Sequence, residues 1–146
     1  MNKTIFLLLT TFLISSIGIS QEWQTNFETA QVMAKERKKP IILVFQGSDW
    51  CAPCIKLDHE IWSTSAFKSY AKDHYIMLQA DFPRKKKNSL SQEQTSANKV
   101  LAEKYNKRGI FPLVVLLDAN GNELGSTSYK KISPKDYIAQ LNSILK

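Results

Sequence analysis

The chain has 146 residues, which fits a single domain, and it carries a formal net charge of +7. Part of this charge lies in the run Arg84-Lys85-Lys86-Lys87, but no aromatic residues interleave with the run as single-stranded nucleic acid requires, so we expect no nucleic-acid partner. The chain has only two cysteines and two histidines. Because their spacing matches no recognised set of zinc ligands, we expect no zinc site.

Residues 1–20 have the order typical of a secretory signal peptide. Lys3 gives a positive start, an apolar centre begins at Ile5, and small residues stand at the two positions that signal peptidase reads, so cleavage before Gln21 is expected. An uncleaved membrane anchor is the alternative, although several serines and threonines dilute the apolar stretch. The folded domain is then residues 21–146.

The rest of the chain alternates between helical and strand patterns. A first helix is expected after Thr25, which has capping-box spacing to Glu28, and Pro40 ends it. The continuous apolar run Ile41–Gln46 predicts a strand covered on both faces. The other expected elements are a helix from about Cys51 that breaks at 63–65 and resumes over 66–73, a strand over 75–81, a helix over 91–106, strands over 113–117 and 123–129, and a helix from 134.

This order, α-β-α-β-α-β-β-α, predicts an α/β fold with a single mixed four-stranded sheet and helices on both faces. Asn120-Gly121 between the last two strands is typical of a hairpin turn. Apolar stripes at helical spacing predict which side chains face inward. The expected inward residues include Ile55, Leu57, Ile61 and Trp62 after the cysteines, Val100 and Leu101 in the helix over 91–106, and Tyr137 and Leu141 in the last helix.

Both cysteines lie in the string Trp50-Cys51-Ala52-Pro53-Cys54, directly after the first core strand. The spacing places two sulfurs within bonding reach of each other. A purely structural disulfide is a weak interpretation, because closing so short a loop stabilises by only about 2 kcal/mol. Cu(I) binding stays open, since soft thiolates suit that ion, but no further residue supports it.

A dithiol that cycles between reduced and oxidised forms is the leading interpretation. The helix start offers unpaired N–H groups and the positive end of a dipole to a thiolate at Cys51. Lowering a thiol pKa from about 8.5 to about 7 needs about 2 kcal/mol, and the dipole supplies only about 0.3–1 kcal/mol. Because Pro53 has no N–H, the Cys54 N–H and S–H are the candidate donors. Cys51 is then the exposed attacking thiol and Cys54 the inner, resolving thiol.

These features resemble the thioredoxin superfamily, and most closely the secreted thioredoxin-like proteins of Gram-negative bacteria. The resemblance rests on the first core strand, the Trp-Cys-x-x-Cys string, and Arg108-Gly109-Ile110-Phe111-Pro112 before a strand and an Asn-Gly hairpin. It covers nearly all of residues 21–146. It implies a thioredoxin fold, a cis Phe111–Pro112 bond facing the cysteines, and substrate contacts from Trp50, Phe111 and Pro112.

The sequence departs from the family pattern in two places. Many thioredoxins bury an acidic residue six positions before the first cysteine, and Phe45 stands there. Asp49 and Asp58 are near in sequence but are expected to be exposed, so proton removal from Cys54 would rely on water or on Glu60. The loop before Pro112 has one more residue after its glycine than the common form, which predicts a differently shaped substrate groove.

The resemblance implies a thiol–disulfide oxidoreductase of the cell envelope, periplasmic or secreted, that needs no cofactor. It would exchange electrons with cysteine-containing protein substrates through a Cys51/Cys54 cycle. Pro53 resembles the reducing members, which implies a reductant supplied by a membrane electron donor. Two alternatives are a non-enzymatic thioredoxin-fold binding module or copper metallochaperone, and a stress-response factor whose cysteine pair is inactive.

Overall fold

The computed structural model describes residues 21–146, and the expected signal peptide and its cleavage lie outside the described residues. The helices and strands follow the expected order with one addition at the start. In chain order they are β1 (Trp23–Gln24), α1 (Phe27–Arg37), β2 (Ile41–Gln46), α2 (Ala52–Leu57), the π-helical turn η1 (Asp58–Trp62), α3 (Ser65–His74), β3 (Ile76–Asp81), the 3-10 turn η2 (Lys86–Asn88), α4 (Gln92–Tyr105), β4 (Leu113–Leu117), β5 (Glu123–Thr127) and α5 (Pro134–Ile144).

The strands form one mixed sheet in the order β1-β3-β2-β4-β5. β1, β3 and β2 are parallel, whereas β4 runs antiparallel to β2 and β5 runs antiparallel to β4. The predicted mixed sheet is confirmed, but the predicted count of four strands was wrong. β1 is the additional strand, and its two residues are too few to show an alternating pattern in the sequence. It is defined only by its pairing with Met77 and Leu78 of β3.

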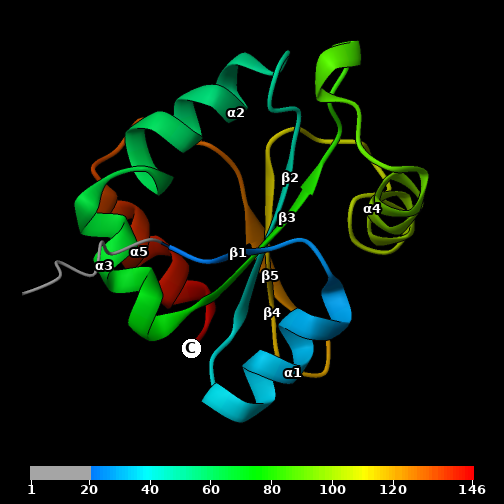
Figure 1. Cartoon of the computed structure of the whole chain (residues 1–146). Helices are drawn as coiled ribbons and strands as arrows, with labels where there is room; N and C mark the ends of the chain where they lie inside the picture. Colours follow the sequence, from blue (N-terminus) through cyan, green and yellow to red (C-terminus); the bar gives the residue numbers. More distant parts are fainter. Residues whose placement is uncertain (1–20) are drawn as a thin grey trace, which may run out of the picture.

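Helices cover both faces of the sheet (Figure 1), with α1 and α4 on one side and α3 and α5 on the other. Successive strand side chains point to opposite faces. Ile41, Leu43 and Phe45 of β2 therefore pack in the cluster that includes residues of α1 and α4. Ile42 and Val44 pack in the cluster that includes residues of η1, α3 and α5. The two cores explain why this strand reads as continuously apolar.

The first helix begins one residue later than expected. Asn26, not Thr25, is its N-cap, and the Asn26 side chain accepts a hydrogen bond from the Thr29 N–H at 2.7 Å. Asparagine is among the strongest N-cap residues, so it prevails over the neighbouring threonine. At the other end of the chain the predicted start is confirmed, since Ser133 caps α5 and Pro134 occupies its first turn.

Two predicted inward residues were wrong: Ile55 is 48% exposed and Val100 is 63% exposed. Each lies beside a buried residue, and one step along a helix turns the side chain by about 100°. The other predicted inward residues of these helices are buried or packed against the core, namely Leu57, Ile61, Trp62, Leu101, Tyr137 and Leu141. Among residues 21–146, no helix has the length and apolarity needed to cross a membrane.

Candidate active site

The cysteine pair lies where β2 ends and α2 begins. A tight turn makes this connection, because the N–H groups of Trp50 and Cys51 both donate to the carbonyl of Gly47, at 3.2 and 2.9 Å. Glycine fits at position 47 because a Cβ added there would overlap the Trp50 indole. Cys51 is the N-cap of α2. The sequence thus folds so that the first sulfur stands at a helix N-terminus, as predicted.

Cys51 and Cys54 form a disulfide with an S–S distance of 2.06 Å and a Cα–Cα distance of 5.2 Å. The Cys54 N–H donates to the Cys51 sulfur at 3.3 Å, so the predicted backbone donor is present. Each cysteine is 4% exposed. The expectation that Cys51 is the more exposed of the two is therefore not met in this oxidised form.

Three aromatic side chains, Trp50, Phe82 and Phe111, form an aromatic rim beside the disulfide turn. The Phe111 ring lies 5.5 Å from the Trp50 ring and 5.5 Å from the Phe82 ring, measured between ring centroids. The Trp50 Nε1–H also donates to the Phe82 carbonyl at 2.7 Å. The Phe111–Pro112 peptide bond is cis, which confirms the expected isomer. Sequence reasoning missed Phe82, whose only signal was its position at the end of a strand.

Asp49 joins the turn before the cysteines to the basic run after β3. Its carboxylate accepts hydrogen bonds from the N–H groups of Arg84 and Lys85 and from the Asn88 side chain, each at 2.9 Å. These bonds, that from Arg84 first, hold the pKa of Asp49 below its usual range because they favour the charged carboxylate. The Arg84 guanidinium carbon lies 3.6 Å from the centroid of the Trp50 ring. The sequence did not predict this connection.

A cavity of about 330 Å³ lies beside Cys54. The Gln46 side chain, which helps to line it, donates to the Gln79 side-chain oxygen at 3.3 Å. Phe45 is fully buried in the core on the α1 and α4 side, so it contributes nothing to this cavity. The complete lining is Trp23, Gln46, Ser48, Cys54, Ile55, Asp58 and Gln79. On the side of the cysteines, the end of β2 therefore presents the neutral amide of Gln46 to this cavity, and not an acidic side chain.

Asp58 is the carboxylate that the structure places next to the second cysteine. It stands four residues after Cys54, on the same side of the helix, and its N–H donates to the Cys54 carbonyl. The Glu60 carboxylate instead accepts a hydrogen bond from the Tyr129 hydroxyl at 2.6 Å and does not line the cavity. Asp58, and not Glu60, therefore shares a cavity with Cys54. The Asp58 side chain is exposed, as expected, and its carboxylate accepts a hydrogen bond from the Ser63 hydroxyl at 3.3 Å. Among residues 21–146, no three His, Cys, Asp or Glu side chains are grouped closely enough to hold a metal ion.

The family model for thioredoxin-like proteins matches residues 22–119. The chain therefore belongs to the thioredoxin-like family. The expected resemblance is confirmed, and the cysteine pair occupies the turn between β2 and α2 in this fold.

Within the family, the chain is similar to the disulfide bond reductase DsbH of Chlamydia pneumoniae. The two are 36% identical over 125 residues, which cover 86% of this chain and 73% of that protein. A solved structure of a DsbH oxidoreductase superposes with a TM-score of 0.80 at 33% identity, covering 97% of this chain and 94% of that one. A thioredoxin from Thermus thermophilus has a TM-score of 0.63 at 15% identity, over 86% of this chain and 88% of that one, which shows the shared fold alone.

Proposed function

We propose that this chain is a thiol–disulfide oxidoreductase of the cell envelope that reduces disulfides in partner proteins. The observation that carries the proposal is the Cys51–Cys54 disulfide at the N-terminus of α2. The similarity to DsbH, named as a disulfide bond reductase, extends over most of both chains and supports the same direction of electron flow here. Export to the periplasm rests on the signal-like residues 1–20 and is part of the proposal.

The reaction transfers two electrons from the reduced Cys51/Cys54 dithiol to a disulfide of the substrate. In the reduced chain, the Cys51 thiolate attacks one sulfur of a substrate disulfide, forms a mixed disulfide, and releases the other substrate sulfur as a thiolate that takes up a proton. Cys54 then loses its proton and attacks the Cys51 sulfur, which releases the second substrate thiol. The chain is left with the Cys51–Cys54 disulfide that the structure contains. A membrane-bound dithiol donor would return it to the reduced form.

The site favours Cys51 as the attacking thiol. As N-cap it lies at the positive end of α2, and the Cys54 N–H already points to its sulfur. A hydrogen bond to a charged acceptor is worth about 1.5–3 kcal/mol, which together with the helix dipole covers the roughly 2 kcal/mol needed for a thiol pKa near 7. Trp50, Phe111 and Pro112 are the proposed substrate contacts beside it.

The resolving step needs a group that takes the proton of Cys54. Asp58 is suited to this role because, of the described residues that line the cavity, it alone carries a carboxylate. Gln46 and Gln79 bind each other through their amides, which cannot take up a proton at neutral pH. We assign Asp58 as the proton acceptor, acting through water in the cavity.

Reduction of insulin by the purified chain, with a small dithiol as electron source, tests the proposal. Catalysed reduction that is lost in Cys51→Ser is expected. The copper-binding alternative predicts a different result, namely tight Cu(I) binding to the reduced chain in a competition titration without disulfide turnover. A reduction potential close to that of strong thiol oxidants, about −120 mV, would overturn the reducing direction.

A further inference from the structure

We propose that the run Arg84–Lys87, here named the basic arm, is a docking surface for protein substrates that carry acidic residues next to their reacting disulfide. This inference rests on the proposed function and specifies its class of substrate. The sequence alone does not place this run relative to the cysteines. The structure places the arm beside the active site and holds it there.

The backbone of the arm is fastened at several points. Asp49, two residues before Cys51, binds the N–H groups of Arg84 and Lys85 and the side chain of Asn88. Just before the arm, the Phe82 N–H donates to the Gln46 carbonyl at 2.9 Å, and the Phe82 carbonyl accepts from the Trp50 indole. These bonds join the arm to the segment that carries the cysteines. The backbone that carries these charges is therefore held beside the disulfide turn.

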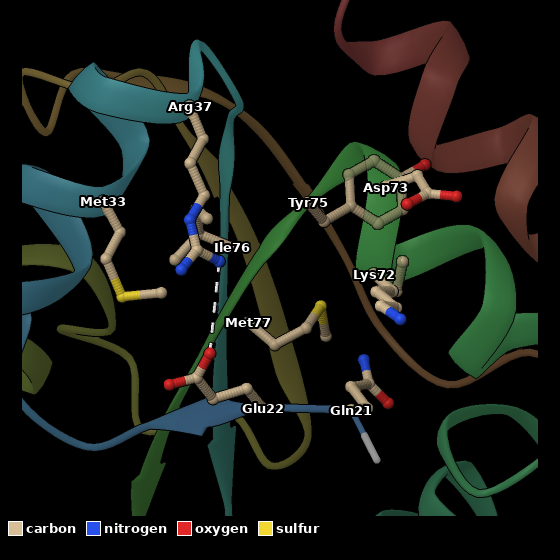
Figure 2. Close-up of a pocket in the computed structure, with 10 residues that line it drawn as sticks. Gln21, Glu22, Met33, Arg37, Lys72, Asp73, Tyr75, Ile76 and Met77 are labelled. Atoms are coloured by element: carbon tan, nitrogen blue, oxygen red, sulfur yellow. Dashed lines mark ion pairs between the residues drawn. The ribbon is translucent and has the colours of Figure 1, made fainter. Parts of the chain in front are cut away.

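The charges of the arm face solvent and are largely uncompensated. All four basic side chains, Arg84, Lys85, Lys86 and Lys87, are exposed. Asp49 is the carboxylate that contacts the arm. The nearby Asp81 carboxylate instead accepts hydrogen bonds from Ser48, from its N–H at 2.9 Å and from its hydroxyl at 2.6 Å. In the described part of the chain, the single ion pair within 4.0 Å joins Arg37 to Glu22 (Figure 2), so no residue of the arm takes part in one.

The register of the sheet places the arm and the cysteines at the same end of the strands, the carboxyl end. β2 and β3 are parallel, and their last residues, Gln46 and Asp81, are paired. The cysteine turn follows one strand and the arm follows the other, so both leave the sheet at its carboxyl edge, where η2 and the start of α2 lie in Figure 1. The arm begins at the aromatic rim, because the Arg84 guanidinium carbon lies 3.6 Å from the Trp50 ring centroid.

An acidic protein segment fits this surface by charge and by position. A substrate whose disulfide reaches Cys51 must approach over the aromatic rim, and the arm extends directly from that rim. Complementary charge beside the reacting atoms raises the association rate, with an effect that salt reduces. An anionic membrane offers the same sign of charge, but binding there would place the bilayer over the edge that substrates must reach. The arm therefore favours a protein partner.

The test compares reduction of three peptides by the pre-reduced chain in single-turnover reactions. The peptides share one disulfide ring and differ only in flanking residues, which are two Glu, two Gln or two Lys. We expect the Glu peptide to react about tenfold faster than the Lys peptide at low salt, and this ratio to shrink toward one in 0.5 M NaCl. Equal rates for all three peptides would overturn the inference.

Two variants with the same change of charge locate the effect. Lys86→Glu/Lys87→Glu reverses two charges of the arm, whereas Lys35→Glu/Lys72→Glu reverses two exposed charges in the helix turns before β2 and β3, at the opposite edge of the sheet. The arm variant should lose or invert the preference for the Glu peptide, and the control should keep it. Loss of the preference in both variants, or in neither, would overturn the assignment to the arm.

The Gln peptide separates this inference from the function on which it rests. If the chain fails to reduce the Gln peptide, the proposed reductase activity fails. If it reduces all three peptides equally, that activity stands and the docking surface falls. Cosedimentation with phosphatidylglycerol–phosphatidylcholine vesicles checks the membrane: binding that Lys86→Glu/Lys87→Glu abolishes, without any peptide preference, would assign the arm to lipid and overturn the proposal.

Discussion

The backbone N–H of Cys54 donates a hydrogen bond to the sulfur of Cys51 across 3.3 Å. This bond connects the local sequence to the chemistry, because Pro53 removes one N–H from the turn and leaves that of Cys54 pointing to the sulfur. In the reduced chain the same N–H would stabilise a thiolate at Cys51. The arrangement therefore assigns different roles to two chemically identical side chains.

The first prediction concerns these two roles. Cys51→Ser should reduce the rate of insulin reduction to the uncatalysed level, because the attacking sulfur is missing. Cys54→Ser should still attack but should stop at the mixed disulfide, which non-reducing electrophoresis and mass spectrometry detect. Trapping by Cys51→Ser instead of Cys54→Ser would reverse the assignment.

The second prediction concerns the proton of Cys54. Asp58→Asn removes the carboxylate that shares a cavity with this cysteine and should slow resolution of the mixed disulfide about 100-fold at pH 7, at the low end of the range of general base catalysis. The rate should recover as the pH rises above about 8.5, where thiols ionise without help. Stopped-flow measurement from pH 6 to 10 gives both values.

Glu60→Gln is the matched control for Asp58→Asn. It removes a carboxylate from the same helical stretch, but one that binds the Tyr129 hydroxyl and does not line the cavity. Its rate of resolution should match that of the natural chain at every pH. Slowing by Glu60→Gln together with normal resolution by Asp58→Asn would move the role to Glu60.

The third prediction concerns pH and the basic arm. The hydrogen bonds from Arg84, Asn88 and Lys85 hold the folded-state pKa of Asp49 below its unfolded value, which is near 3.8. The carboxylate therefore contributes stability that is fully present above that unfolded value and is lost as the pH falls through the lower, folded pKa. Urea unfolding from pH 2 to 6 should show a smaller loss of stability on acidification in Asp49→Asn than in the natural chain. An identical pH dependence would contradict the prediction.

Much of the fold could be predicted because its signals are local. Continuous apolar runs marked β2 and β4, and Ser133 with Pro134 marked the start of α5. The prediction failed where a shift of one residue along a helix decides which side chain is buried. Ile55 and Val100 lie next to buried positions and were expected to face inward, but both are exposed.

The site could be predicted only in part. Cys51, Cys54 and the cis Phe111–Pro112 bond follow from motifs along the chain. The hydrogen bonds from Arg84 and Lys85 to Asp49 join residues that are 35 and 36 positions apart in the sequence. The Trp50–Phe82 hydrogen bond joins residues 32 positions apart, so no local pattern contains these contacts. These contacts depend on the register between β2 and β3, which the sequence does not state.

The fourth prediction tests the corrected face of α4. Leu101 is 6% exposed and its neighbour Val100 is 63% exposed. Leu101→Ala should lower the free energy of unfolding by about 2–4 kcal/mol through lost burial and a cavity. Val100→Ala should change it by less than about 0.5 kcal/mol, as is usual for surface positions. If urea denaturation gave similar losses of unfolding free energy for both variants, the placement of Leu101, and not Val100, on the buried face of α4 would be contradicted.

The fifth prediction concerns the close approach of Gly47 to Trp50. Gly47→Ala places a methyl group where the indole lies, so the ring must move away from the Phe82 carbonyl that it now binds. Overpacking of this kind costs about 1–3 kcal/mol, and the displaced rim should also lower the rate of substrate reduction. Tryptophan fluorescence and urea unfolding measure the two structural effects.

The same Gly47→Ala change in a Trp50→Ala background identifies the cause. With the indole absent, the added methyl group meets no ring, so its cost in unfolding free energy should fall to within about 0.5 kcal/mol of zero. The double-mutant cycle then returns a coupling close to the full cost of Gly47→Ala alone. An undiminished cost without Trp50 would mean that Gly47 is required by the backbone of the turn, and that its contact with the indole does not position the aromatic rim.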